Sequence, residues 1–332
     1  MFRTITRRGF VGRATAALAA SALPIGAAHA AGVPSLKLGM GTWVGYCPVY
    51  IALAKGFYEE AGVALELTTF SGNDAAPAFA AGRVDMTSTA GSSALTLAAN
   101  GIAFKNFLIP DFSVGADGIL ARNTIKDLAD FKGRRIAVEL VAVSHFMLLQ
   151  VLDTVGLKEE DVTLINLAPD VAAAAYRSGE VDIAVTYAPY LGQVNKEVPD
   201  GRIIFDTAAM PTAIVDYYQV RDDVLAAKPE AVKAFVKATF KGLDFLRSDP
   251  AAALDICAKA MGVPADAVAQ DLKGVYLPSP QENVAAMTDP QSQYYVIDKM
   301  RALAEFLVGK GQIQAVPDLA KFYDASVVKA VL

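Results

Sequence analysis

Chemically reactive residues are scarce in this sequence of 332 residues, which contains two cysteines and two histidines. Cys47 and Cys257 are too few and too far apart to form a disulfide framework or a zinc-binding pattern. We favour two buried free thiols, and a bond between them stays open. His145 is the only histidine after residue 30, and Ser144 beside it cannot form a catalytic pair with it, because adjacent helical side chains point apart. No phosphate-loop or calcium-loop pattern occurs, so we expect no catalytic residue, no metal and no cofactor.

Basic residues are in the minority, and long apolar runs are absent after the first thirty residues. The chain has 30 Lys plus Arg against 35 Asp plus Glu, which gives a formal net charge of −5. An acidic surface repels phosphates and anionic lipid, which argues against nucleic-acid and membrane-surface partners. After residue 30 no uninterrupted apolar run reaches the roughly 18 residues of a membrane-spanning helix. We therefore expect no such helix in the mature chain.

The first thirty residues have the composition of an export signal. A basic start is followed by an Ala/Leu-rich stretch at 14–23, and Ala28-His29-Ala30 places small residues at the first and third positions before a cut. The run at 6–11, with Arg7 and Arg8, resembles a twin-arginine export motif. An ordinary secretory signal with adjacent arginines is the alternative. We predict that residues 1–30 are removed and that the mature protein is periplasmic.

The mature chain repeats one pattern of strands and helices. The first copy has predicted strands at 36–40, 65–69 and 84–87 and helices at 48–61 and 74–81. The second has strands at 135–139, 163–167 and 181–186 and helices at 144–155 and 170–178. A glycine follows each helix (Gly62, Gly82, Gly156 and Gly179), and an Asp begins each Ala-rich helix as an expected N-cap (Asp74 and Asp170). Such units imply parallel strands joined by helical crossovers, so two copies predict an α/β fold with two similar lobes.

The remaining segments complete this two-lobe organisation. Residues after 222 have helical patterns, for example at 229–245 and 293–308, and we expect these helices to pack outside the first lobe. The segments 104–122 and 212–221 are the expected crossings between lobes. We place the first lobe at residues 31–111 and 216–332, and the second at 112–215.

Ligands of open parallel sheets bind at the loops that follow the carboxyl ends of the strands. This rule selects six loops, at 41–46, 70–74, 88–93, 140–144, 168–170 and 187–190. Two lobes that face each other through such loops form a cleft that hinge motion can close. The candidate polar and aromatic contacts are Trp43, Tyr46, Asn73, Ser88, Ser144, His145 and Tyr187. Each serine has helix capping as its alternative role, and each aromatic residue has core packing.

Acidic residues are the more informative part of the predicted site. Asp111 and Asp117 lie on the first crossing, Asp216 lies on the second, and Glu139 ends a strand. No lysine or arginine falls in the six loops. An oxyanion site usually presents arginine or several donors, whereas carboxylates in an apolar cleft suit an amine, amidine or guanidinium group. The alternative is that these acids only bond backbone groups at the hinge.

Several motifs occur in the order typical of one family. These are Pro48-Val49-Tyr50 through Lys55-Gly56-Phe57-Tyr58 to Gly62-Val63, Ala80-Ala81-Gly82-Arg83-Val84-Asp85, Asp127-Leu128 with Lys132-Gly133, Ser144-His145-Phe146, and Tyr176–Tyr190. Residues 36–246 thereby resemble the nitrate, sulfonate, taurine and thiamine-precursor group of solute-binding proteins. The resemblance implies a type II periplasmic binding fold, a small-molecule ligand and the permease of an ABC importer as partner. We expect a monomer.

One departure from that family bears on the ligand. The second copy ends in Tyr187-Ala188-Pro189, where many relatives have Trp-Glu-Pro. Together with the acidic first crossing, this favours a small nitrogen-containing solute that is guanidine-, urea- or amine-like. The alternative ligand is an aliphatic sulfonate, taurine or a nitrate-type anion. An enzyme similar to thiamine-pyrimidine synthases is a further alternative, because fold does not fix function.

Overall fold

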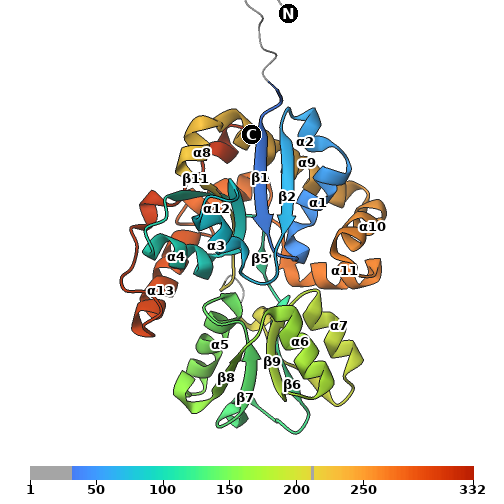
Figure 1. Cartoon of the computed structure of the whole chain (residues 1–332), viewed down its shortest axis with the longest axis vertical. Helices are drawn as coiled ribbons and strands as arrows, with labels where there is room; N and C mark the ends of the chain where they lie inside the picture. Colours follow the sequence, from blue (N-terminus) through green and yellow to red (C-terminus); the bar gives the residue numbers. More distant parts are fainter. Residues whose placement is uncertain (1–31, 211–212) are drawn as a thin grey trace, which may run out of the picture. The chain divides into compact units, whose positions relative to one another are not determined.

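The computed structural model describes residues 32–210 and 213–332, and the predicted export signal at 1–30 lies outside this part of the chain. Two mixed five-stranded sheets organise the described residues (Figure 1). The first sheet has the strand order β2 (Ala64–Thr69), β1 (Ser35–Met40), β3 (Met86–Ala90), β11 (Asp216–Arg221) and β4 (Phe104–Leu108). The second has the order β10 (Gly201–Asp206), β6 (Asp117–Arg122), β9 (Ile183–Tyr187), β7 (Arg135–Val138) and β8 (Thr163–Asn166).

Both sheets contain the same unit of three parallel strands, as the repeated sequence pattern predicts. β1 pairs in parallel with β2 and β3, and β7 pairs in parallel with β8 and β9. An antiparallel strand then lies beside the third strand of each unit, β11 beside β3 and β6 beside β9. These two strands occupy parts of the segments that the sequence assigns only to crossings. The predicted lobe boundaries, at 111/112 and 215/216, stay a prediction. We call the first sheet and its helices the first lobe, and the second sheet and its helices the second lobe.

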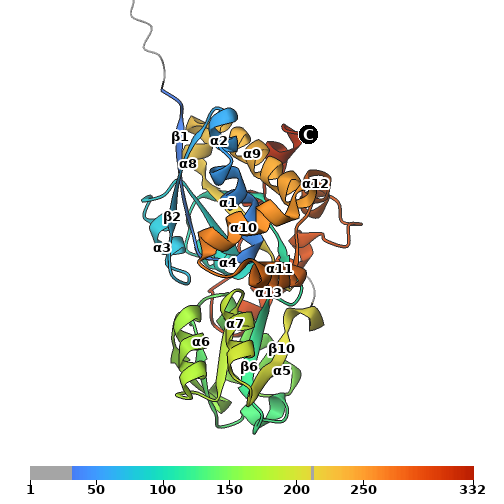
Figure 2. The same ribbon diagram turned by 90° about the vertical axis from the view of Figure 1, so that its right-hand side faces the viewer.

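Helices cover both sheets. Before residue 200 they are α1 (Cys47–Ala54), α2 (Phe57–Glu60), α3 (Ala75–Ala80), α4 (Gly91–Ala99), α5 (Val143–Thr154), α6 (Pro169–Ser178) and α7 (Tyr190–Glu197). After residue 220 they are α8 (Asp222–Ala227), α9 (Pro229–Ser248), α10 (Pro250–Met261), α11 (Ala265–Asp271), α12 (Pro280–Thr288), α13 (Val296–Gly309) and α14 (Ser326–Lys329). Figures 1 and 2 show α5 on one side of the second sheet and α6 with α7 on the other. Strand β6 serves both sides, because Ile119 packs into one core and Leu120 into the other.

The helices after residue 222 pack into the core of the first lobe. Phe235 of α9 lies at its centre, with ring centroids 5.5 Å from Tyr58, 5.3 Å from Tyr218 and 6.0 Å from Phe107. Gly242 permits close packing of α9 on α1, because a Cβ there would lie 2.1 Å from the carbonyl oxygen of Pro48. Within the described residues, no helix has both the length and the apolar character needed to cross a membrane.

Two local predictions are wrong. The helix expected at 48–61 is divided into α1 and α2, because Gly56 adopts the left-handed conformation with φ 70°. The predicted Asp cap of the second Ala-rich helix is absent, because Pro169 takes the first position of α6 and Asp170 lies inside it. Asp74 does occupy the N-cap position of α3, but its side chain makes no capping bond. The predicted stops are confirmed, since all four helix-ending glycines have positive φ.

The two cysteines lie close together in the core of the first lobe. Both are buried free thiols, and Cys257 Sγ lies 3.9 Å from the carbonyl oxygen of Cys47. Cys47 begins α1 and Cys257 belongs to α10. Burial raises the pKa of the Cys47 thiol. The structure therefore contains them in the free form that the sequence favours.

Candidate ligand-binding site

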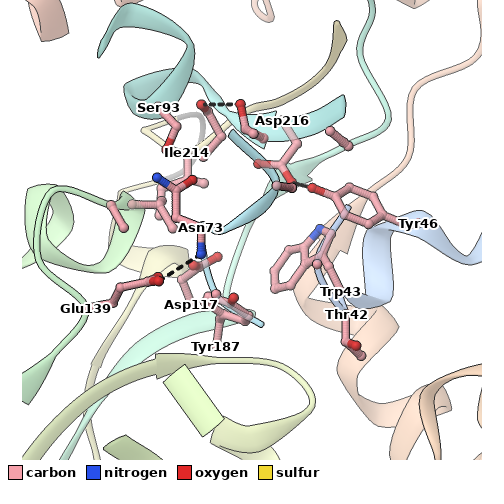
Figure 3. A pocket seen from close by; sticks show the side chains of 18 residues that line it. Thr42, Trp43, Tyr46, Asn73, Ser93, Asp117, Glu139, Tyr187, Ile214 and Asp216 are labelled. Atoms are coloured by element: carbon pink, nitrogen blue, oxygen red, sulfur yellow. Dashed lines mark hydrogen bonds between the residues drawn. The ribbon is translucent and has the colours of Figure 1, made fainter. Parts of the chain in front are cut away.

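A cavity lies at the carboxyl ends of β1, β3, β7 and β9, between residues of the two lobes (Figure 3). Its volume is about 60 Å³, whereas one water molecule needs roughly 10–15 Å³ on the same measure. The residues that line it are Gly41, Thr42, Trp43, Tyr46, Gly72, Asn73, Ala75, Ser88, Thr89, Ala90, Ser93, Asp117, Glu139, Ala142, Val143, Tyr187, Ile214 and Asp216. The space suits a solute with only a handful of non-hydrogen atoms.

Five of the six loops selected from the sequence contribute to this lining. The loop at 168–170 contributes none, although Ser71 Oγ of the first lobe donates to Asp170 Oδ1 at 3.4 Å. Most of the predicted site residues line the cavity, namely Trp43, Tyr46, Asn73, Ser88, Asp117, Glu139, Tyr187 and Asp216. Asp111, Ser144 and His145 do not.

Each of these three residues has a position that explains its absence from the lining. Asp111 is 1% exposed and lies behind Trp43. Ser144 is buried in the first turn of α5 and its Oγ has no partner among the described residues. His145 accepts a hydrogen bond at Nδ1 from the Val141 N–H at 3.3 Å, and its Nε2 lies 3.3 Å from Glu159 Oε1. His145 therefore bonds within the second lobe.

Asp216 forms one acidic point of the wall. It begins β11, where the second crossing enters the first sheet, and the Tyr46 hydroxyl donates to its Oδ2 at 2.6 Å. Burial raises the pKa of Asp216 to about 6, and the bond from Tyr46 opposes that rise. The carboxylate is thus buried with a neutral donor and without a countercharge among its hydrogen-bond partners in the described residues. Such a group favours a cationic ligand.

Asp117 forms the second acidic point, at the start of β6. It is 3% exposed, and its Oδ2 has no hydrogen-bond partner among the described residues. Its backbone N–H donates to Ser113 Oγ at 3.2 Å, which holds this end of the first crossing in place. Burial, the largest cause, raises the pKa of Asp117 to about 7. A buried oxygen without a partner in the cavity wall is a candidate acceptor for a ligand.

Glu139 forms the third acidic point, immediately after β7. Its Oε1 accepts the Asn73 backbone N–H at 2.8 Å, so it joins the second lobe to a loop of the first (Figure 3). Gly72 makes the approach possible, because it has φ 48° and a Cβ there would lie 2.1 Å from Glu139 Oε1. Burial raises the pKa of Glu139 above its usual range.

Aromatic rings from both lobes complete the wall. The indole of Trp43 meets the ring of Tyr187 edge-on, with centroids 5.7 Å apart and planes at 90°. Trp43 follows β1 and Tyr187 ends β9, so this contact also spans the two lobes. An aromatic pair of this kind offers both faces and edges to an organic cation.

Donor groups also line the cavity. Helices α4 and α5 begin there, with Ala90 and Ala142 at their N-cap positions and no side-chain cap on either. The first N–H groups of a helix have no partner within it and carry partial positive charge. Ser93 adds a hydroxyl from the first turn of α4. Ser93 belongs to the loop predicted at 88–93, whereas Ile214 was not selected as a site residue, since nothing in the sequence distinguishes it from other crossing positions.

The cavity is acidic as a whole. Among the described residues that line it, three are carboxylates and none is lysine, arginine or histidine. Elsewhere in the described part of the chain, no group of three or more His, Cys, Asp or Glu side chains could hold a metal ion. The arrangement can surround a small solute with carboxylates, aromatic rings and helix N-termini, and Asp216 lies beside Ala90, where α4 begins.

The chain matches a known family. A model described as NMT1/THI5 like matches residues 43–253, which is more than half of the chain. The taurine-binding periplasmic protein of Escherichia coli (strain K12) is 30% identical over 283 residues, covering 81% of this chain and 85% of that protein. The chain therefore belongs to the NMT1/THI5-like family, and the predicted resemblance is confirmed.

Other relatives differ in what they do. The alkanesulfonate-binding protein SsuA from Xanthomonas axonopodis pv. citri, solved bound to MOPS, has a TM-score of 0.74 at 20% identity and covers 89% of this chain and 99% of its own. That likeness confirms the α/β fold of periplasmic binding proteins. The 4-amino-5-hydroxymethyl-2-methylpyrimidine phosphate synthase of Aspergillus parasiticus is 25% identical over 232 residues, covering 63% of this chain and 65% of that enzyme. The family thus contains binding proteins and at least one enzyme.

Proposed function

We propose that this chain is the periplasmic solute-binding component of an ABC importer and that its ligand is a small organic solute with a cationic amine or amidine group. One observation carries the proposal: Asp117, Glu139 and Asp216 line a cavity whose described lining has no basic side chain. A cationic group would compensate carboxylates that are otherwise buried at a cost. An anion without such a group would add negative charge beside them.

The taurine-binding relative supports a specific first candidate. Taurine is an aminoethanesulfonate, with an ammonium at one end and a sulfonate at the other. Its ammonium can pair with Asp117 and Asp216, which line the cavity. Its sulfonate can accept from the N–H groups where α4 and α5 begin, because helix N-termini and hydroxyls bind oxyanions. An aminoalkanesulfonate is therefore consistent both with the ligand named for the taurine-binding relative and with the carboxylates of the cavity wall. Guanidine- and urea-like solutes are the next candidates.

Binding without turnover is the activity that the site residues support. The cavity has carboxylates, hydroxyls and aromatic rings, and the thiol of Cys47 lies buried beneath it rather than in its wall. His145 bonds within the second lobe. The pyrimidine-synthase relative makes an enzyme the second candidate. Recovery of the solute unchanged after prolonged incubation with the protein distinguishes the two.

Isothermal titration with three matched ligands tests the proposal. Taurine has both charged ends, ethanesulfonate lacks the amine, and ethylamine lacks the sulfonate. We expect taurine to bind and ethanesulfonate to bind at least two decades more weakly, because unpaired buried carboxylates cost about 3 kcal/mol or more. Guanidinium, urea and nitrate complete the panel. Equal affinities for taurine and ethanesulfonate, or binding of nitrate with every nitrogen base inert, would overturn the amine proposal.

A further inference from the structure

Asp111 makes a contact that the binding of a cation does not explain. It belongs to the first crossing, lies outside the cavity lining, and accepts the indole N–H of Trp43 at Oδ2 over 3.0 Å. Trp43 is itself 6% exposed and lines the cavity. The carboxylate therefore lies on the far side of a cavity-wall residue and touches that residue rather than the space where a ligand fits.

The backbone beside this bond leaves room for it. A Cβ on Gly45 would lie 2.1 Å from Asp111 Oδ2 and 2.4 Å from Trp43 Nε1. Gly45 has no left-handed conformation that would otherwise call for glycine. Any larger residue at this position would push apart the two atoms of the bond. Glycine at position 45 is thus explained by the space that the Trp43–Asp111 bond requires.

Asp111 also connects the two crossings beneath Trp43. Its carbonyl oxygen accepts the backbone N–H of Asp216 at 3.1 Å. Asp216 in turn accepts from Tyr46, which is three residues after Trp43 in the same loop. One short network therefore joins both crossings to the loop that follows β1. The Trp43 indole also contacts the ring of Tyr187 in the second lobe, with the two planes at 90°.

We propose that Asp111 is a positioning residue, which holds the Trp43 indole in the cavity wall and does not bind the ligand's charge. A side chain with an acceptor oxygen and the same shape can do this without a negative charge. Asp117 and Asp216, which line the cavity, are then the carboxylates that meet a cationic group. This division of roles depends on the proposed function only for the ligand, since the position of Trp43 can be measured without one.

Fluorescence of the ligand-free protein tests the positioning role directly, because Trp43 is the only tryptophan in the chain. Asp111→Leu removes the acceptor and keeps a similar volume, whereas Asp111→Asn keeps an acceptor oxygen. We expect the leucine variant to show a red-shifted emission and a several-fold rise in acrylamide quenching, and the asparagine variant to restore the native values. Native emission and quenching in Asp111→Leu would overturn the proposal, because the indole would then be held by packing alone.

A thermal double-mutant cycle covers the case in which the leucine variant packs poorly. Trp43→Phe removes the indole donor, so the losses in melting temperature of Trp43→Phe and Asp111→Leu should sum to more than the loss in their double variant. The cycle with Asp111→Asn, which keeps the acceptor oxygen, should be close to additive. Strict additivity in the leucine cycle would contradict the bond. Taurine binding tests whether the charge of the Asp111 carboxylate acts on the ligand. Asp111→Asn should weaken taurine binding far less than Asp216→Asn, and an equal loss would assign Asp111 a direct electrostatic role. If taurine does not bind, the proposed function fails, while the fluorescence and melting measurements still decide the role of Asp111.

Discussion

The Asn73 backbone N–H donates to Glu139 Oε1 at 2.8 Å, and this bond joins the loop after β2 in the first lobe to the residue after β7 in the second. Glu139 was predicted as a ligand contact from its place at a strand end. Its oxygen is instead engaged across the cavity, although the residue still lines it. The bond therefore supports a second role for Glu139, in holding the two lobes closed.

The first prediction concerns this closing bond. Glu139→Ala should weaken taurine binding by about one decade, because a hydrogen bond to a charged acceptor contributes roughly 1.5 kcal/mol. Glu139→Gln keeps an acceptor oxygen and should lose less. Small-angle scattering should find the ligand-free alanine variant more extended than the native protein. Glu180→Ala removes an exposed glutamate of the second lobe and serves as the control. Native affinity and native scattering in Glu139→Ala would show that the bond does not contribute to closure.

The second prediction concerns the two carboxylates that we assign to the ligand's cation. Asp117→Asn and Asp216→Asn should each weaken taurine binding by about two decades or more, since breaking a buried charge pair from one side costs about 3 kcal/mol. Asp182→Asn makes the same change at an exposed position before β9 and should leave the affinity unchanged.

Stability of the ligand-free variants separates loss of a contact from loss of the fold. Asp117→Asn replaces a buried carboxylate, which has no compensating cation among the described residues of the ligand-free protein, by a neutral amide, so the melting temperature at pH 8 should stay equal or rise. A marked fall in melting temperature would mean that Asp117 stabilises the fold rather than a ligand.

The third prediction concerns the space beside Trp43. Gly45→Ala places a Cβ that would lie 2.1 Å from Asp111 Oδ2. Because the side chains of Trp43 and Asp111 are both buried, either the Trp43–Asp111 hydrogen bond must lengthen or the loop must shift. Overpacking of this kind costs about 1–3 kcal/mol of folding free energy. We expect a lower denaturation midpoint and a red-shifted Trp43 emission. Gly309→Ala is the control, because a Cβ there meets nothing within 4 Å. Equal midpoints for the two variants would contradict the close packing.

The sequence predicts much of this architecture because the relevant signals are local. The helix-ending glycines, the parallel units around β1 and β7, and the loops at their carboxyl ends all follow from short segments. The strands β6 and β11 were missed because each joins its sheet only after the chain has crossed between lobes. Their pairing with β9 and β3 depends on the folded chain and leaves no distinct local pattern.

For the acidic residues of the site, too, local sequence predicts position better than side-chain contacts. Composition and position place Asp111, Asp117, Glu139 and Asp216 near one cleft. Only the folded chain shows that Asp111 bonds to Trp43, a residue 68 positions away, and that Asp117 lines the cavity, although each of the two keeps one oxygen without a partner in the described structure. Sequence reasoning can therefore identify the acids of the site, but not which of them meets solvent, ligand or another side chain.

The last prediction concerns pH. Burial raises the pKa of Asp117 to about 7 and that of Asp216 to about 6, from an ordinary value of 3.8. Between 3.8 and these values the folded, ligand-free protein keeps protons that the unfolded chain has released. Its free energy of unfolding should therefore fall as pH rises through this window. A bound ammonium favours the ionised carboxylates, so taurine affinity should rise as pH increases from 5.5 to 7.5 and then level off.

Calorimetry measures this coupling between the solute and the proton. Titrations at pH 6.5 in buffers with different ionisation enthalpies should show that taurine binding releases protons, and that this release is smaller in Asp117→Asn. The same variant should flatten the rise of affinity with pH, while Asp182→Asn keeps the native profile. Affinity that is constant or falls over this range would mean that the bound solute does not meet ionised carboxylates. A solute held only by the helix N-termini and hydroxyls would give that result, because those groups do not titrate there.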